Sequence, residues 1–273
     1  MLGTVRHVAS EDIYTHGHAD AVLRSHRWRT AENSAAYLLP SLEPGMRLLD
    51  VGCGPGTLTV DLARRVAPGE VVGVDVSRQV VDEARAHAAA AGVANVSFEV
   101  ADFRTMDVGA FDVVHAHQVL QHLQDPVEAL GHMRRLGRPG GVVAARDSVY
   151  SSFTWAPDEE RLRRWLEIYL AVTARNGADA DAGKRLLGWA REAGCTDVRY
   201  STSTWTFATA EDRAWWGELW ADRTVGSALA EQAVEYGAAT PDELAEVAAG
   251  WRGWAEEHDG VFVVLHGEIV ARA

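Results

Sequence analysis

Short runs of apolar, largely β-branched residues alternate with helical patterns along the middle of the chain. The runs that predict strands cover residues 46–51, 70–76, 95–101, 111–117 and 140–147. Between them, apolar residues recur every three or four positions over residues 57–66, 78–91 and 126–136, which predicts helices. Strands that are apolar on both faces and separated by helices are typical of a parallel sheet covered on both sides. The pattern predicts an α/β fold with a doubly wound sheet.

The segment before this alternation is polar and rich in histidine, and it closes with a helical pattern. We expect that helix to end at Leu39 and Pro40, because proline disfavours helical geometry in the residue before it. We therefore predict an N-terminal helical cover over residues 1–44 and a ligand-binding α/β core over residues 45–150.

The chain after residue 150 completes the sheet and adds helices. Its predicted elements are helices over residues 157–175 and 182–193, a strand over 197–209, two or three helices within 211–258 and a final strand over 261–273. Ten tryptophans occur in the chain, and nine of them follow residue 150. We predict that residues 151–273 complete the sheet and carry a tryptophan-rich helical insert, at about 208–258, between two late strands.

Composition narrows the choice of partner and compartment. With 26 Lys and Arg against 39 Asp and Glu, the net charge of −13 repels a polyphosphate backbone, so we expect no nucleic-acid partner. No run reaches the ~18 apolar residues of a membrane span. The two cysteines, Cys53 and Cys195, stand apart without disulfide or zinc spacing. We expect a cytoplasmic protein without a membrane span, and we leave a monomer and a homo-oligomer open.

The stretch "DVGCGPG" at residues 50–56 places three glycines between the first predicted strand and a helix. Glycines at such a turn let a ligand approach the main chain and the positive end of the helix. Asp75 ends the next predicted strand, 19 residues after Gly56, where a carboxylate can accept hydrogen bonds from both hydroxyls of a ribose. Asp102 ends the third predicted strand beside Phe103, where the edge and face of an adenine would lie. These features together predict a nucleoside site.

The spacing of the glycines decides between two kinds of nucleoside. A dinucleotide fingerprint needs glycine at the first, third and sixth positions, whereas here the sixth position is Thr57. The chain also has no Tyr-x-x-x-Lys pair and only one lysine, Lys184. A nicotinamide-dependent oxidoreductase is therefore a weaker alternative. A sensor or scaffold that binds the nucleoside without turnover is a further alternative.

From residue 45 to about 150, the order and spacing of these motifs resemble the class I S-adenosylmethionine-dependent methyltransferases. The match is closest to the small-molecule branch that includes the ubiquinone and menaquinone biosynthesis enzymes. The resemblance implies a Rossmann-like mixed sheet, S-adenosylmethionine as cofactor, S-adenosylhomocysteine as product and a small-molecule acceptor. The cofactor-binding residues that it implies are Asp50, Gly52, Cys53, Gly54, Gly56, Asp75, Val76, Asp102, Phe103, His117, Gln118 and Tyr14. We interpret Cys53 as a small residue in a crowded turn, because no base is identifiable for it as a nucleophile.

Methyl transfer from a sulfonium needs mainly positioning and exclusion of water, and a base assists when the acceptor loses a proton. His117 ends the fourth predicted strand, where the ligand crevice of such a sheet lies, and is the first candidate base. His122 and Asp147 are further candidates, with a structural role as the alternative for each. The pairs His16/His18 and His115/His117 have no further ligand at a diagnostic interval, so we expect no metal site.

Two segments are candidates to cover the acceptor. The N-terminal segment carries Tyr14, His16 and His26, which predict a lid, with a simple packing helix as the alternative. The late tryptophans either line a pocket for an apolar or aromatic acceptor or build a helical core. We predict a mostly apolar acceptor covered by residues 1–30, 150–180 and 205–255.

Overall fold

The computed structural model describes residue 15, residues 20–107 and residues 110–273. Within these residues a parallel half and an antiparallel half meet in one sheet of eight strands. The strands are β1 (Leu48–Val51), β2 (Val71–Asp75), β3 (Val96–Val100), β4 (Phe111–His117), β5 (Gly137–Ser148), β6 (Thr154–Ala156), β7 (Thr196–Phe207) and β8 (Val261–Arg272). The helices are α1 (Asp20–Arg27), α2 (Ala31–Ser34), α3 (Thr57–Val66), α4 (Arg78–Ala90), α5 (Pro126–Leu136), α6 (Glu160–Arg175), α7 (Ala182–Glu192), α8 (Ala210–Gly226), α9 (Ala228–Glu235) and α10 (Pro241–Glu256).

The strand order is β3-β2-β1-β4-β5-β8-β6, and β7 also pairs with β8. Strands β1 to β5 pair in parallel, whereas β8 runs antiparallel to β5, β6 and β7. This order confirms the predicted doubly wound mixed sheet. The predicted crossover helices exist because the local signals are strong: Asp125 caps α5 by accepting from the Glu128 N–H, and Pro126 follows at the first helical position, where no N–H is needed.

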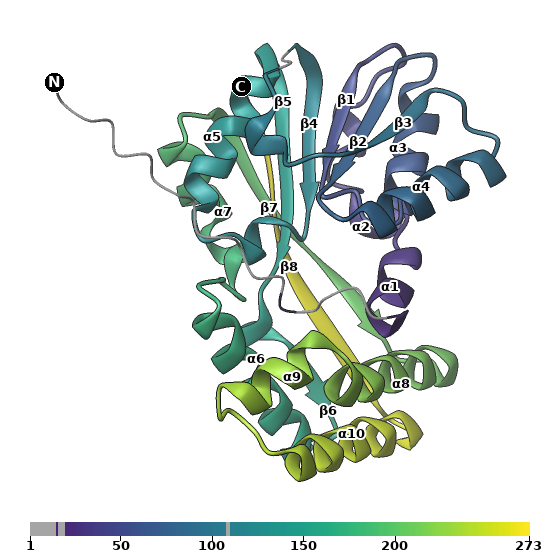
Figure 1. Cartoon of the computed structure of the whole chain (residues 1–273), viewed down its shortest axis with the longest axis vertical. Coiled ribbons are helices and arrows are strands. Elements are labelled where there is room, and N and C mark those ends of the chain that lie inside the picture. The colour runs from purple at the N-terminus through teal and green to yellow at the C-terminus, as the bar shows by residue number, and fades with distance from the viewer. Residues whose placement is uncertain (1–14, 16–19, 108–109) are drawn as a thin grey trace, which may run out of the picture.

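The long strands β7 and β8 join the α/β core to a helical lobe. Figure 1 shows both strands running from the core toward α6, α8, α9 and α10, which gather at the opposite end of the molecule from β1 to β4. The second half of β8 pairs with β5, and its first residues, 261–263, pair with β6. Helices α8, α9 and α10 lie between β7 and β8 in the chain, so the tryptophan-rich insert between late strands is confirmed.

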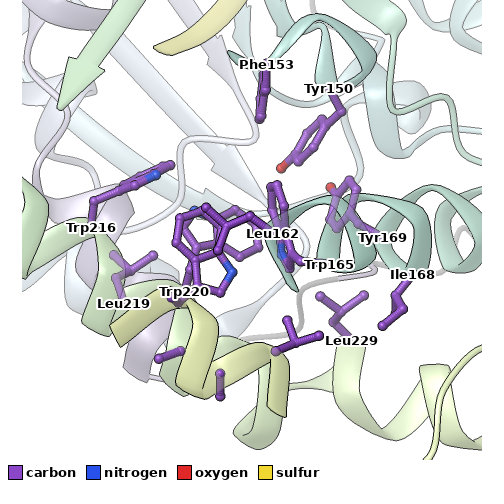
Figure 2. Packing of buried hydrophobic residues seen from close by; sticks show 14 of the residues in the cluster. Tyr150, Phe153, Leu162, Trp165, Ile168, Tyr169, Trp216, Leu219, Trp220 and Leu229 are labelled. Atoms are coloured by element: carbon purple, nitrogen blue, oxygen red, sulfur yellow. The ribbon is translucent and has the colours of Figure 1, made fainter. Parts of the chain in front are cut away.

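Tryptophans form much of the core of the helical lobe. Trp165 packs edge-on against Trp220 at 4.5 Å and against Trp251 at 4.9 Å between ring centroids. Figure 2 shows Trp165 and Trp220 side by side, with Leu162 beside them and Tyr169 on the other side of Trp165. Aromatic rings bury large areas and pack favourably in edge-on pairs. This cluster packs the helices of the insert against α6, β7 and β8 in one core.

Helix α1 connects the two parts. Its Arg27 pairs with Glu83 on α4 at 2.6 Å, and its Arg24 pairs with Asp222 on α8. The Thr57 hydroxyl donates to the backbone oxygen of His26 at 2.9 Å, which adds a contact to α3. The helix therefore bridges the α/β core and the insert.

Three element boundaries differ from the predictions. The helix that was predicted to end at Leu39 and Pro40 ends at Ser34 instead. After Ser34 the chain turns so that Ala35 and Leu38 are both buried. Pro40 then lies in the 3-10 helix η1 (Leu39–Ser41). Strand β5 begins at Gly137 rather than at 140, because Gly137 already pairs with Phe111 and a bulge separates this pair from the one between Val113 and Val142.

Helix α6 begins at Glu160 rather than 157. The chain is extended before it, since Thr154–Ala156 pair with β8 as the unpredicted strand β6. The three-residue strand is too short to show a periodic signal in the sequence.

Candidate active site

A cavity of about 560 Å³ lies at the carboxyl ends of β1, β2 and β4 and extends under the helical insert. Residues of the glycine turn and of the ends of these strands line one part of it. Residues of α1, η4 (Tyr150–Ser152), β7 and α8 line the other part. In an open α/β sheet, ligands bind beyond the carboxyl ends of the strands. The cavity is therefore the candidate active site.

The glycine turn brings main chain to the cavity wall. Gly52 and Gly54 line the cavity with left-handed φ angles of +66° and +53°. A Cβ on Gly52 would overlap the side chain of Val119, which also lines the cavity. Both positions therefore require glycine for conformation, and Gly52 requires it for space as well.

Gly56 and Cys53 act in packing. Gly56, which we expected to contact the ligand, does not line the cavity. A Cβ there would come within 2.8 Å of Ala84 and 2.9 Å of Phe98, so Gly56 allows α3 to pack on its neighbours. Cys53 lines the cavity, but burial raises the pKa of its thiol well above the ordinary value. The thiol stays protonated, which agrees with its interpretation as a small residue of the turn.

The two downstream carboxylates both line the cavity and are held in defined orientations. Asp75 accepts from the Gly54 N–H at 3.1 Å and from the Ser77 N–H at 3.0 Å. Asp102 caps the 3-10 helix η2 (Phe103–Thr105) and pairs with the Arg104 guanidinium at 2.9 Å. Hydrogen bonds from Arg104 outweigh partial burial and lower the pKa of Asp102. Both groups are therefore oriented acceptors at the cavity rim.

Apolar side chains stand beside these carboxylates. Val76 follows Asp75 and is 69% exposed, an unusual exposure for valine, yet it lines the cavity together with Ala101 and Phe103. Phe103 itself is buried. Apolar surfaces next to oriented acceptors are suited to a flat heterocycle that presents N–H groups at its edge.

Asp50 and His115 support the floor of the site. Asp50 accepts from the Thr59 hydroxyl at 2.6 Å and contacts His115 Nδ1 at 2.7 Å. Asp50 lines the cavity, whereas His115 does not. His115 therefore pairs with a carboxylate inside the core. Among the residues that the structure describes, no group of three potential metal ligands occurs.

His117 and His122 both line the cavity. Burial, reinforced by the charge of Arg29, lowers the pKa of His117 well below 6.5 and that of His122 to about 3. Both imidazoles are therefore neutral at physiological pH. The His117 ring lies 5.9 Å from Trp205 and 6.5 Å from His266 between centroids, and its two nitrogens are buried without a hydrogen-bond partner among the described residues.

Gln118, at the end of β4, contacts three side chains. Its Oε1 accepts from Arg29, and its Nε2 lies 2.8 Å from the Ser148 hydroxyl and 3.0 Å from His266 Nε2. Because Arg29 can only donate, the amide nitrogen must face His266, whose Nε2 then accepts. The residue has a left-handed φ of +55°, which marks a strained position of the kind found at functional sites.

Asp147 departs from the expectation that it faces the acceptor. It does not line the cavity; it is fully buried and accepts from the Gln121 N–H at 3.1 Å. Burial raises its pKa to about 8, so it is mainly protonated at neutral pH. The side chain points from β5 beneath η3 (Leu120–His122), where it supports the loop rather than the substrate.

The far part of the cavity combines aromatic rings with two arginines. Trp205, Trp216, Trp220, Tyr150 and Phe153 line it, whereas Trp165, Trp251 and Trp254 belong to the core and do not. Some of the late tryptophans thus line the cavity, and others only build the helical core. Arg29 and Arg223 also line the cavity, and sequence reasoning missed both, because no local pattern distinguishes them from surface arginines.

Each of the three segments expected to cover the acceptor contributes lining residues. His26, together with Ser25, lines the cavity from α1. Tyr14, His16 and His18 lie outside the described residues. In the part of the chain that the structure describes, no helix is long and apolar enough to cross a membrane.

The sequence from residue 42 to 194 matches a family of methyltransferase domains, and this match covers more than half of the chain. The chain belongs to this methyltransferase family. An uncharacterized methyltransferase of Schizosaccharomyces pombe is 33% identical over 267 residues, which cover 94% of this chain and 95% of the relative. A ubiquinone biosynthesis O-methyltransferase of Neisseria meningitidis is 38% identical over 102 residues, or 36% of this chain and 42% of the relative.

Solved structures agree on the fold. Phosphoethanolamine N-methyltransferase 2 of Haemonchus contortus superposes on the methyltransferase described here with a TM-score of 0.55 at 16% identity, covering 92% of this chain and 57% of that one. The family and the fold together make the protein a class I methyltransferase that uses S-adenosylmethionine, as the resemblance implied. They do not favour the nicotinamide oxidoreductase or the sensor.

The glycine part of the cavity fits this cofactor. The main chain of Gly52 and Gly54 leaves room at the turn, Asp75 is an oriented acceptor, and Val76 presents an exposed apolar surface. These are the features that an adenosine with an aliphatic tail requires.

Proposed function

We propose that this methyltransferase transfers the methyl group of S-adenosylmethionine to an oxygen, nitrogen or carbon atom of a small, mostly apolar or aromatic metabolite. The observation that carries the proposal is one continuous cavity, which begins at the glycine turn and continues beneath the tryptophan-rich insert. Cofactor and acceptor can therefore occupy adjoining parts of one space. The similarity to a ubiquinone biosynthesis O-methyltransferase, over 36% of this chain, supports methyl transfer to a small molecule.

The proposed roles at the cofactor end follow from the placement of the groups. Asp75 holds the ribose hydroxyls, Asp102 accepts from the adenine edge, and Val76 and Phe103 contact the ring faces. The main chain of Gly52 and Gly54, with Gln118 and Asp50 nearby, surrounds the amino-acid part. Gly56 and Cys53 shape the turn.

Bound S-adenosylmethionine supplies a methyl group on a positively charged sulfur, and the charge is lost as the methyl leaves. The protein's own contribution is to orient the acceptor and exclude water. The rings of Trp205, Trp216 and Trp220 form the apolar wall for this purpose. His117 is placed to accept the proton when the acceptor has one to lose, because it lines the cavity and both ring nitrogens lack a partner among the described residues. Burial, which lowers its pKa, keeps it neutral but also weakens it as a base.

The proposal is tested with trideuteromethyl-labelled S-adenosylmethionine and a whole extract of the cells from which the gene derives, which contains small molecules, protein and nucleic acid. We expect mass spectrometry to find label in one or a few apolar, low-mass metabolites. Replacing His117 with Asn should lower kcat about 100-fold with little change in the KM for S-adenosylmethionine. His258→Asn, at an exposed histidine outside the cavity, is the control. Label found only in protein or nucleic acid would refute the proposal.

A further inference from the structure

His115 belongs to the His115/His117 pair of the sequence, and the proposed function gives it no role. It lies on β4 beside Asp50 of β1, because the register of these parallel strands pairs the two residues. Both side chains are buried, with 0% of the His115 side chain and 4% of the Asp50 side chain exposed. Of the two residues, only Asp50 lines the cavity. The pair therefore reaches the site through the carboxylate alone.

The Asp50 carboxylate is held at both of its oxygens. Oδ1 lies 2.7 Å from His115 Nδ1, and Oδ2 accepts from the Thr59 hydroxyl at 2.6 Å. An ionised carboxylate only accepts hydrogen bonds, so the hydrogen between it and the imidazole lies on Nδ1. The two oxygens offer about four acceptor positions, of which these contacts use one on each oxygen. Asp50 is therefore fixed in orientation and can still accept from a ligand in the cavity.

The stability of the sheet does not account for this polar pair. Its neighbours along the two strands are buried apolar residues: Leu49, Val51, Val114 and Ala116. His115 Nε2 is buried and has no hydrogen-bond partner among the described residues, which is unfavourable for folding. Apolar residues of similar volume often stabilise such a position at least as well as a buried charged pair does. A task at the cavity wall explains why the pair is present.

The cofactor brings a matching charge to this end of the cavity. S-adenosylmethionine carries an α-ammonium group, which needs a charged or hydrogen-bonding partner when it leaves water. Asp50, Asp75 and Asp102 are the acidic residues among the described residues of the lining. Asp75 and Asp102 have the ribose and the adenine as their proposed partners. Asp50 directly precedes the glycine turn that surrounds the amino-acid part, so it is the carboxylate placed for the ammonium group.

We propose that His115 is a positioning residue of the cofactor site, which holds the Asp50 carboxylate in place to accept from the α-ammonium group of S-adenosylmethionine. This inference rests on the roles proposed for the cofactor end, and it adds a residue that does not itself touch the cofactor. Without the Nδ1 hydrogen, the carboxylate loses one of its two donors and its fixed orientation. His115 thus acts on recognition of the amino-acid part and leaves the adenosine contacts unchanged.

The experiment is calorimetric titration of the full chain with two probes. One is S-adenosylhomocysteine, which carries the same α-ammonium group as the cofactor. The other is deamino-S-adenosylhomocysteine, which keeps the adenosine, the sulfur and the carboxylate but lacks the amino group. We expect the wild type to bind S-adenosylhomocysteine about tenfold or more tightly than the deamino analogue, because a hydrogen bond to a charged group is lost in the analogue.

Four variants locate the origin of this preference. His115→Leu removes the donor, so the preference should fall to about threefold or less while the affinity for the deamino analogue stays near that of the wild type. His115→Asn keeps an N–H close to the position of Nδ1 and should restore most of the preference. Thr59→Val removes the other donor and should also lower it. Asn95→Leu is the control, because Asn95 donates to the backbone oxygens of Ala63 and Gly69 inside the core and does not line the cavity.

The outcomes separate this inference from the proposed function. An equal loss of affinity for both probes in His115→Leu assigns the residue to the core alone and overturns the inference. A wild type that binds both probes equally also overturns it and leaves the cofactor site in place. No binding of either probe to the wild type contradicts the cofactor site itself. Melting temperatures establish that each variant is folded. Should His115→Leu not fold, an unchanged preference in Thr59→Val overturns the inference.

Discussion

Gly52 offers a sharp test of the glycine turn because the chain contains a matched control. Gly52 has a φ of +66° and Gly92 a φ of +65°, so alanine carries nearly the same backbone strain at both positions. Around Gly92 nothing lies within 4 Å of an added Cβ, whereas at Gly52 the Cβ would overlap Val119. The two substitutions therefore differ mainly in the contact at the cavity wall.

The strain alone costs about 1 kcal/mol for alanine in the left-handed region. Overlap with a packed side chain adds roughly 1–3 kcal/mol. We expect Gly92→Ala to lower the free energy of unfolding by about 1 kcal/mol and Gly52→Ala by about 2–4 kcal/mol. Because Val119 must shift and lines the cavity, Gly52→Ala should also weaken S-adenosylhomocysteine binding about tenfold or more.

Urea denaturation gives the two free energies, and calorimetry gives the affinities. Gly92→Ala should bind S-adenosylhomocysteine as the wild type does. If both variants lose equal stability, or if Gly52→Ala binds with wild-type affinity, the account of the turn as a close-fitting wall of the cofactor site is wrong.

Two further predictions concern buried groups. Burial raises the pKa of Asp147 from 3.8 to about 8, so between these values the folded state keeps a proton that the unfolded state releases, and stability falls as pH rises through this window. Asp147→Asn removes this dependence and should gain stability relative to the wild type between pH ~5 and ~8 in urea denaturation; a constant difference across this range would contradict the prediction. Trp216 lines the cavity without a partner for its indole N–H among the described residues, whereas Trp254 does not line it and donates to the Ala156 oxygen at 3.0 Å. Trp254→Phe should therefore lower the free energy of unfolding by about 1 kcal/mol more than Trp216→Phe does. Only Trp216→Phe should raise the KM for the acceptor. Equal effects of the two substitutions on KM would assign both rings to the core.

The strands and crossover helices of the α/β core were predictable because each has a strong local signal. Runs of apolar residues mark β1, β2 and β4, and capping residues mark the start of α5. The short strand β6 and the early end of α2 were not predictable. Both depend on packing against distant residues, which local periodicity does not contain.

The candidate site, too, was predictable from the sequence only in part. The turn follows β1, Asp75 is the last residue of β2 and Asp102 lies just beyond β3, so their spacing from the strands located them. The sequence did not reveal which glycines face the cavity: Gly56 belongs to the same glycine-rich turn, but a Cβ there would meet Ala84 and Phe98 rather than the cavity. Arg223 is far from the glycine turn in the sequence, and it reaches the cavity only because α1 and α8 pack together.

A single binding experiment addresses the central claim that the glycine end of the cavity holds S-adenosylmethionine. Val76 is 69% exposed and lines the cavity, so Val76→Asp introduces a charge at the proposed adenine face with little effect on folding. Val234→Asp, at an exposed valine of α9 outside the cavity, is the control.

In calorimetric titrations with S-adenosylhomocysteine, the account predicts one site per chain in the wild type and in Val234→Asp, and an affinity about tenfold or more weaker in Val76→Asp. Wild-type affinity in Val76→Asp, or no binding to the wild type, would contradict it.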